Sequence, residues 1–256
     1  MNGSPALAAA WLGRVDYPAA WSWQRELFLA RLEDERPDTL MLLEHPPTYT
    51  IGRRGVADDL VYGEVERGAR GISLFQVDRG GRATYHGPGQ LVGYPILSLG
   101  ERYDVVRYLR DLEEVLIRTA AALGVEAVRD PDHTGVWVGS DKIGAIGVKI
   151  TRGISMHGFA FNVTTDLSMF EGIVPCGIQG RWVTSIEALT GRRYSTKEVA
   201  NLAAAHAAEV FGRTLVWAHP RTLRGDGVVR AVEVPAMQGN VIEPGCSLVP
   251  APADNL

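Results

Sequence analysis

Residues 135–163, GVWVGSDKIGAIGVKITRGISMHGFAFNV, contain three runs that are typical of β-strands. The runs cover residues 135–139, 142–150 and 154–163, and no helical segment separates them. Parallel strands need a long crossover connection, usually a helix, whereas antiparallel strands can follow one another directly. The stretch therefore predicts antiparallel pairing and an α+β fold rather than repeated βαβ units.

Around this stretch, the apolar spacing predicts three helices. They cover residues 18–35, 104–124 and 195–212. Asp104 is a candidate N-cap, and Ser195 with Glu198 forms a capping-box pair. Further strand-like runs occupy residues 39–45, 72–78 and 91–99. We expect a single domain with a mixed or antiparallel sheet flanked by helices.

The periodic pattern fades after residue 214 and gives way to sequence rich in proline and glycine. We expect residues 10–214 to form the catalytic domain. We expect residues 215–256 to form a C-terminal appendage that is partly disordered.

The composition excludes several classes of protein. With 46% hydrophobic and 22% charged residues the chain is typical of soluble globular proteins, and its net charge of −4 argues against nucleic acid as a partner. Cys176 and Cys246 are too few for a disulfide framework, which favours a cytoplasmic location. No positively charged segment precedes the apolar run near the N-terminus, and no stretch approaches the roughly 18 apolar residues of a membrane span. We expect no membrane partner.

Familiar cofactor motifs do not occur in the sequence. GPGQLVG (residues 87–93) lacks the spacing of a dinucleotide-binding loop, and there is no Walker A loop or H-E-x-x-H motif. None of the six histidines forms a convincing metal-ligand pair. The sequence predicts neither a metal nor another cofactor.

Cys176 is the candidate nucleophile. It lies in GIVPCGIQG (residues 172–180), where proline and glycine would place the thiol on a sharp turn; the alternative is an inert buried cysteine. A thiol needs a cationic or basic neighbour to be substantially ionised at neutral pH. The candidates are Lys142, Lys149, His86 and His157, and for Lys149 we expect a solvated surface position.

The glycine-rich stretch RGGRATYHGPGQ covers residues 79–90. Glycine suits backbone that adopts positive φ or approaches a ligand closely. The stretch is either a long turn between strands or a cradle that holds a substrate.

Four blocks together resemble the octanoyltransferases of lipoate biosynthesis. They are RGGRATYHGPGQLVGYPI (79–96), KIGAIGVKI (142–150), HGFAFNV (157–163) and GIVPCGIQGRWVTS (172–185). The resemblance covers residues 10–212, with the blocks in the same order. The wider superfamily includes biotin-protein and lipoate-protein ligases and shares an α+β fold. The extended C-terminal tail departs from the family pattern.

The resemblance implies an acyl transfer. The family takes octanoyl from acyl carrier protein and delivers it to a lysine on lipoyl domains of 2-oxoacid dehydrogenases and on the glycine-cleavage H protein. By this resemblance Cys176 carries the acyl thioester and Lys142 lowers the pKa of the thiol. No cofactor or ATP is expected, because transfer from thioester to amide runs downhill.

The resemblance also implies which residues contact the substrate. They are Arg79, Gly80, Gly81, Arg82, Ala83, Thr84, Tyr85, His86, Ala145, Ile146, Gly147, Gly158, Phe159 and Ala160. The glycines would then line an acyl slot, Gly147 and Gly158 among them. We expect His86 beside the reacting centre and Arg79 and Arg82 near the mouth.

Two other functions remain compatible with the sequence. One is an ATP-dependent lipoate ligase on the same fold, which would use free octanoate and ATP. The other is a non-catalytic protein that binds acyl groups or lipoyl domains. A covalent octanoyl adduct on Cys176 is expected of the octanoyltransferase alone.

Overall fold

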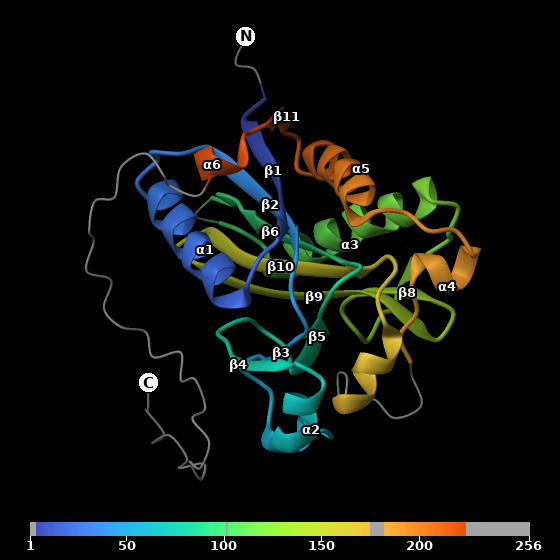
Figure 1. Ribbon diagram of the computed structural model, residues 1–256. Coiled ribbons are helices and arrows are strands. Elements are labelled where there is room, and N and C mark those ends of the chain that lie inside the picture. Colours follow the sequence, from blue (N-terminus) through green and yellow to red (C-terminus); the bar gives the residue numbers. More distant parts are fainter. Residues whose placement is uncertain (1–3, 101, 175–181, 224–256) are drawn as a thin grey trace.

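The computed structural model describes residues 4–100, 102–174 and 182–223, and within them a large mixed sheet forms the centre of the molecule (Figure 1). Its eight strands lie in the order β11-β1-β2-β6-β10-β9-β8-β7. The strands are β1 (Ala6–Arg14), β2 (Asp38–Glu44), β6 (Gln90–Ile96), β7 (Val128–Arg129), β8 (Val136–Val138), β9 (Asp141–Thr151), β10 (Ile154–Asn162) and β11 (Thr214–Trp217). β11, β1 and β2 run parallel, and every later pair in this order is antiparallel. The antiparallel pairing predicted within residues 135–163 is confirmed.

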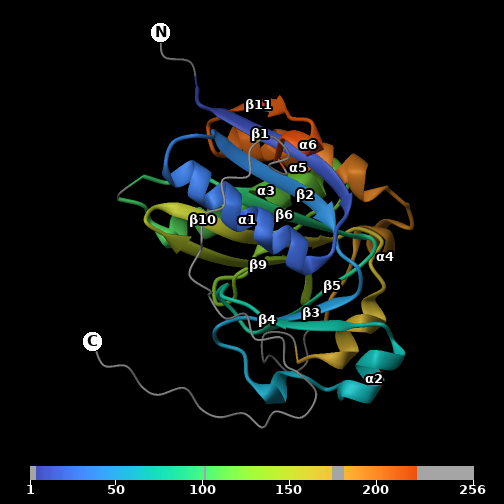
Figure 2. The same ribbon diagram turned by 60° about the vertical axis from the view of Figure 1, so that its left-hand side comes forward.

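Helices cover both faces of this sheet (Figure 2). α1 (Tyr17–Leu32) packs on one face, and α3 (Val105–Ala122) and α5 (Thr196–Val210) pack on the other. The predicted helix starts are confirmed. The Asp104 carboxylate accepts hydrogen bonds from the first turn of α3, and Ser195 and Glu198 form the capping box of α5.

Alternation along the strands divides the core into two clusters. In β2, Leu40 and Leu42 pack towards α3 and α5, whereas Met41 and Leu43 pack towards α1. All four side chains are fully buried. The predicted single domain with a mixed sheet and flanking helices is confirmed.

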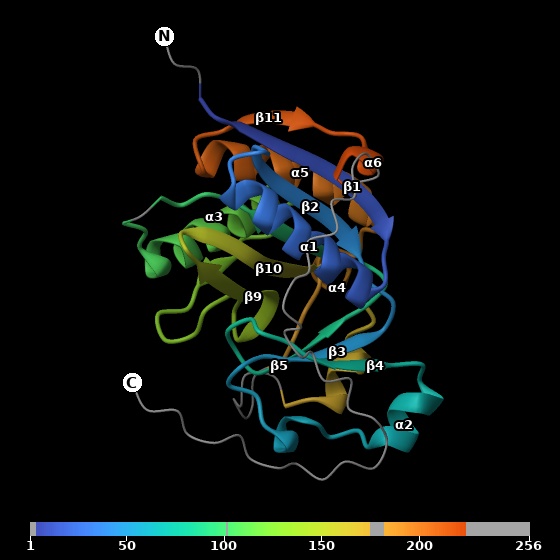
Figure 3. The ribbon, with the colours of Figure 1, turned by 90° about the vertical axis from the view of Figure 1, so that its left-hand side faces the viewer.

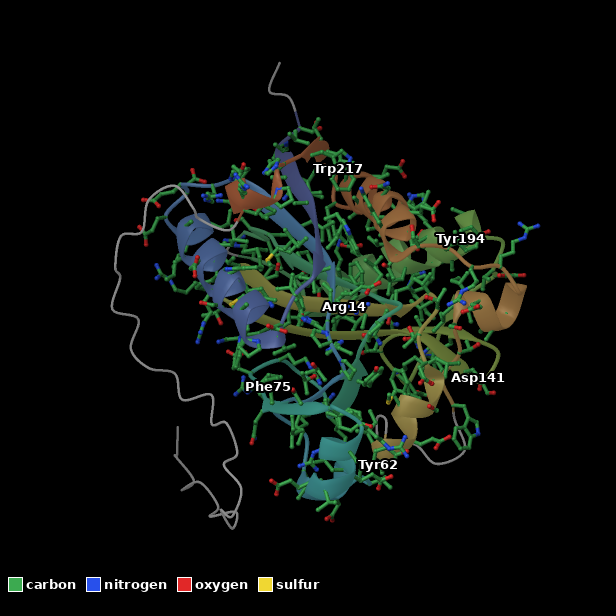
Figure 4. The ribbon with its side chains drawn as sticks, viewed as in Figure 1. Arg14, Tyr62, Phe75, Asp141, Tyr194 and Trp217 are labelled. Atoms are coloured by element: carbon green, nitrogen blue, oxygen red, sulfur yellow. The ribbon has the colours of Figure 1, made fainter. Side chains whose placement is uncertain are left out.

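A second, smaller sheet lies at one end of the main sheet (Figure 3). It has the order β4-β3-β5 and consists of β3 (Thr48–Ile51), β4 (Ser73–Gln76) and β5 (Ala83–His86). The short helices η1 (Ala57–Asp59), α2 (Glu64–Ala69) and η2 (Leu167–Gly172) belong to the same end. Its core includes Tyr49, Tyr85 and Phe170. Figure 4 labels Tyr62 and Phe75 in this region.

The main sheet extends past both predicted domain boundaries, 10 and 214. Residues 6–9 of β1 pair in parallel with residues 214–217 of β11. α6 (Pro220–Leu223) follows, and its Leu223 is buried in the cluster under α1. Residues 214–223 therefore belong to the folded domain, and the rest of the predicted appendage lies outside the described residues.

Candidate active site

A cleft of about 530 Å³ opens where the small sheet meets β9 and β10. It brings together most of the predicted site residues. Those that line it are Arg79, Gly81, Arg82, Ala83, Thr84, His86, Lys142, Ala145, Ile146, Gly147, Gly158, Phe159 and Ala160. Five further lining residues were not among the predicted site residues, namely Tyr17, Tyr94, Asp132, His133 and Thr134.

Two predicted site residues, Tyr85 and Gly80, are not part of the cleft lining. Tyr85 is 1% exposed and packs between Tyr49 and Phe170, so the core of the small sheet and not the cleft requires it. The backbone N–H of Gly80 donates to the Val148 carbonyl at 2.9 Å, which joins the glycine-rich loop to β9. Cys176 lies outside the described residues.

Small residues from two neighbouring strands form one wall of the cleft. Ala145 pairs directly with Ala160, and Gly147 pairs with Gly158. Both glycines line the cleft, and other backbone approaches each of them closely. A Cβ on Gly147 would lie 3.0 Å from the Gly80 carbonyl, and one on Gly158 would lie 2.2 Å from the Gly93 carbonyl. Gly158 therefore has no room for a side chain, whereas at Gly147 a Cβ would fit only if its neighbours moved by a few tenths of an ångström.

The two predicted arginines, Arg79 and Arg82, have different hydrogen-bond partners. Arg79 is buried rather than near the mouth, and its Nη2 donates to the carbonyl and hydroxyl oxygens of Thr50 at 2.8 Å. Arg82 is partly exposed, and its Nε donates to the buried Asp59 carboxylate at 2.9 Å. Arg79 therefore stabilises the loop, whereas Arg82 borders the opening.

Arg54 adds a cation to the cleft wall. Its turn is fixed to the glycine-rich loop, because the N–H groups of Arg53 and Arg54 donate to the carbonyls of Arg79 and Gly81 at 3.0 and 3.1 Å. The Arg54 side chain is exposed and lines the cleft. Asp132 is the single carboxylate that lines the cleft among the described residues, so the wall is positive on balance.

Lys142 reaches the cleft from β9 and is 8% exposed. Its Nζ donates to the Thr134 carbonyl at 3.2 Å and lies 4.5 Å from the centre of the Trp137 ring. Its backbone N–H donates to the Trp182 carbonyl, and its carbonyl accepts from the Thr184 N–H. These bonds fix the ammonium at the cleft and tie β9 to the segment that follows residue 181.

The chain is also held before residue 175. The N–H of Val174 donates to the Asp59 carbonyl at 2.8 Å, and Leu60 forms a bridge with Ile173. Asp59 is the partner of Arg82 at the opening. The segment after residue 181 is therefore bonded to Lys142 of the cleft, and the segment before residue 175 is bonded to Asp59, the partner of the cleft residue Arg82.

His86 lies inside the cleft and is 6% exposed. Its ring is stacked on Tyr17, with centroids 6.0 Å apart, and its Nδ1 is 2.9 Å from Gln90 Oε1. Burial, reinforced by the nearby His45, holds the pKa of His86 well below its usual value. His86 is therefore neutral at physiological pH.

Asp78, Lys149 and His157 form a cluster beside the cleft. The Asp78 carboxylate accepts from Lys149 Nζ at 2.6 Å and from His157 Nε2 at 2.7 Å. Burial opposes the charge on Asp78, but these two hydrogen bonds outweigh it and hold the pKa of Asp78 well below its usual value. The expected solvated position of Lys149 is wrong, because its side chain is ion-paired and 20% exposed.

His157 is the member of this cluster that lines the cleft. Its φ of 56° is rare for a residue with a side chain, and its backbone N–H donates to Gln24 of α1 at 2.9 Å. The His157 ring is buried, and its hydrogen bond from Nε2 to Asp78 fixes the orientation of the ring.

Neither a membrane-spanning helix nor a metal site is found in the described part of the chain. No helix in residues 4–100, 102–174 or 182–223 has the length and hydropathy of a membrane span. Within the same residues no group of three or more His, Cys, Asp or Glu side chains is placed to hold a metal ion.

Comparison with known proteins identifies the fold. The family model for the lipoyl protein ligase A/B catalytic domain matches residues 16–208. A solved lipoate-protein ligase A with bound ATP superposes with a TM-score of 0.66 at 21% identity, covering 88% of this chain and 94% of that one. A putative lipoate protein ligase from T. acidophilum gives a TM-score of 0.65 at 19% identity, covering 88% and 93%. The sheet, the helices on both faces and the cleft thus define a catalytic domain of the lipoyl protein ligase class.

Similarity of sequence narrows this class. The octanoyltransferase of Rubrobacter xylanophilus is 56% identical over 182 residues, which are 70% of this chain and 82% of that protein. The octanoyltransferase of Mycolicibacterium smegmatis is 46% identical over 218 residues, 83% of this chain and 92% of that protein. The chain belongs to the octanoyltransferase family, and the resemblance predicted from its four blocks is confirmed.

Proposed function

We propose that this chain transfers an octanoyl group from octanoyl-acyl carrier protein to a lysine of lipoyl domains, through a thioester on Cys176. The acceptors are lipoyl domains of 2-oxoacid dehydrogenase complexes and the glycine-cleavage H protein. The observation that carries the proposal is the cleft, which is lined by predicted residues of three of the four blocks, Lys142 among them. The solved structure of a bipartite lipoate protein ligase with its E2 lipoyl domain supports an acceptor of this kind for the fold.

The reaction has two steps. First the Cys176 thiolate attacks the carbonyl carbon of the donor thioester, the bond from carbon to the donor sulfur breaks, and the carrier leaves as a thiolate. The lysine amine of the acceptor then attacks the new thioester, and the bond from carbon to Cys176 Sγ breaks. The amine loses one proton and the sulfur gains one. Because the product is an amide, the step runs downhill without ATP.

Lys142 supports the first step. A fixed ammonium stabilises a nearby thiolate and lowers the pKa of the thiol. Lys142 Nζ is held at the cleft by Thr134 and Trp137, and its backbone is bonded to residues 182 and 184. The described chain therefore resumes after residues 175–181 with residues that are hydrogen-bonded to the backbone of Lys142, the proposed cation.

The wall formed by Ala145 and Ala160 suits an acyl chain, because two methyl side chains leave space that larger residues would fill. Phe159 and Ile146 add apolar surface to the cleft. An octanoyl group has no hydrogen-bonding atoms beyond its carbonyl, so an apolar wall of this kind binds it by burial.

The test is the intact mass of the protein after incubation with octanoyl-acyl carrier protein. We expect one octanoyl adduct that maps to the peptide containing Cys176. The Cys176→Ser variant should form no adduct, whereas the control Cys246→Ser should behave as wild type. An adduct that forms only with free octanoate and ATP, or one that survives in Cys176→Ser and is lost in Cys246→Ser, would overturn the proposal.

A further inference from the structure

One charged side chain lies on the buried face of α3. Glu113 is 0% exposed, and the other buried residues of this helix, which the structure describes over its whole length, are uncharged. Burying a carboxylate is unfavourable unless hydrogen bonds and opposite charges compensate it. The partners of Glu113 must therefore explain why the carboxylate lies inside the molecule.

The two oxygens of the Glu113 carboxylate have different partners. Oε2 accepts from Arg110 Nη1 at 2.8 Å and lies 3.4 Å from Arg129 Nε. Both guanidinium groups are more than one third exposed, so a carboxylate at the surface would be able to pair with them. Oε1 instead accepts from the backbone N–H of Gly135 at 2.9 Å, and this bond is buried. The bond to Gly135 is therefore the contact that requires Glu113 in the interior.

Gly135 is the last residue of the loop between β7 and β8, which covers residues 130–135. Arg129 and Val136, on either side of the loop, are partners in the sheet, so the base of the loop is closed. The loop residues that line the cleft are Asp132, His133 and Thr134. A Cβ on Gly135 would lie 3.2 Å from Lys142 Cε, so the backbone of the loop lies directly against the Lys142 side chain.

The peptide unit between Thr134 and Gly135 connects Glu113 to Lys142. Its N–H donates to Glu113 Oε1, and its carbonyl oxygen, which belongs to Thr134, accepts from Lys142 Nζ at 3.2 Å. The peptide is trans, so its N–H and C=O groups point in opposite directions. The carboxylate and the ammonium thus lie at the two ends of one peptide dipole, where each hydrogen bond strengthens the other.

A rotation of this peptide unit would break both hydrogen bonds at once. Gly135 has a φ of 130°, which glycine adopts readily, and glycine restricts the rotation of its peptide less than any other residue. The bond from the Gly135 N–H to Glu113 removes this freedom. Without the carboxylate, the Thr134 carbonyl would be free to turn away from Lys142.

We propose that Glu113 is a positioning residue, which directs the Thr134 carbonyl towards Lys142 and thereby holds the ammonium at the cleft. The inference rests on the proposed function, in which Lys142 acts in this cleft. Glu113 itself does not line the cleft, so its effect reaches the site through the peptide unit and Lys142. Arg110 and Arg129 compensate the charge that this arrangement buries.

The first test observes both hydrogen bonds in the full wild-type chain, without substrate. The lysines of the chain are Lys142, Lys149 and Lys197, so protein labelled with ¹⁵N at lysine Nζ gives a simple spectrum, in which Lys142→Arg identifies the Lys142 signal. We expect this signal to differ from that of the exposed Lys197, and the Gly135 N–H to exchange slowly with solvent. A Lys142 signal that coincides with that of Lys197, or a Gly135 N–H that exchanges as in an unfolded peptide, would overturn the proposal.

The second test removes the carboxylate in Glu113→Gln. The NH₂ group of glutamine only donates, so it would face either the Gly135 N–H or the two guanidinium groups, and one side loses its acceptor. We expect the Lys142 Nζ signal to move towards that of Lys197. The control Leu112→Ala removes a fully buried side chain from the same helix and should leave the signal in place. A signal that Glu113→Gln does not move, or that Leu112→Ala moves equally, would overturn the proposal.

The third test asks whether Glu113 acts through Lys142. In a Cys246→Ser background the remaining thiol is that of Cys176, and its alkylation by iodoacetamide at pH 7 reports the thiolate fraction. Glu113→Gln should slow alkylation by up to about 10-fold, which corresponds to a thiol pKa raised by one, and should have no further effect in Lys142→Ala. Effects that add in the double variant would overturn the positioning role. If Lys142→Ala itself leaves alkylation unchanged while the Nζ signal responds to Glu113→Gln, the proposed role of Lys142 fails and the positioning by Glu113 stands.

Discussion

Lowering the pH from 7.5 to 5 should destabilise this protein through its buried histidines. Burial lowers the pKa of His45 to about 4, and His86 and His157 shift in the same direction. In the unfolded chain a histidine has a pKa of about 6.5. Between the two values the unfolded state binds more protons than the folded state, so stability is lost as the pH falls. For His45 alone the linkage relation gives a loss of about 2 kcal/mol at pH 5.

The geometry explains why His45 resists protonation. Its Nδ1 donates to the Val15 carbonyl at 2.6 Å, so the neutral ring accepts from the Tyr94 hydroxyl through Nε2 at 2.7 Å. A proton on Nε2 would remove the acceptor of the Tyr94 hydroxyl hydrogen and place a positive charge inside the core. Carboxylates of lowered pKa, such as Asp78, stay ionised above pH 5 and do not change the trend.

Urea unfolding at pH 7.5, 6.5, 5.5 and 5 provides the measurement. The unfolding free energy should fall steadily below pH 6.5, and His45→Gln should lose about 2 kcal/mol less than wild type over the same range. The exposed His219 supplies the control, His219→Gln, which should follow wild type. A free energy that is flat between pH 7.5 and 5, or a slope that His45→Gln leaves unchanged, would refute the reasoning.

Three further predictions concern the cleft. Lys142→Ala should move the alkylation of Cys176 by iodoacetamide to higher pH, because loss of a fixed cation raises the pKa of the thiol; an unmoved profile would remove Lys142 from this role. Gly158→Ala should lower the unfolding free energy by about 1–3 kcal/mol, because its Cβ would press on the Gly93 carbonyl, and equal urea midpoints for variant and wild type would contradict this. Arg54→Gln should raise the KM for the acidic carrier-protein donor, whereas Arg53→Gln, outside the cleft lining, should change it less, and the reverse order would exclude Arg54 from donor binding.

The helices and the antiparallel strands could be predicted because their signals are local. Asp104 and the pair of Ser195 and Glu198 mark helix starts within a single turn. In contrast, β1 and β11 come from opposite ends of the domain's sequence and pair in parallel. The alanines of residues 8–10 also show no alternation of polar and apolar residues. A pairing of that kind depends on the completed sheet, so the sequence gives no short-range sign of it.

In the candidate site, too, local features could be predicted from the sequence and long-range contacts could not. The sequence blocks predicted most of the cleft lining, but they did not distinguish which side of β5 faces it, so Tyr85 was included although it packs in the small-sheet core. The pairing of Lys149 with Asp78 joins residues far apart in the chain and could not be read from strand alternation. Gln90 lay within the quoted glycine-rich stretch, but its contact with His86 depends on the turn between them.

The pairing of β1 with β11 has a practical consequence for producing shortened forms of the protein. Residues 6–9 and 214–217 are partners, so a clone cut at both 10 and 214 would remove the two halves of one seam together. It would leave β2, with the fully buried Leu40, beside an unpaired sheet edge. Unpaired edges of this kind recruit strands from other molecules. Expression clones should therefore begin before Ala6 and continue through Leu223.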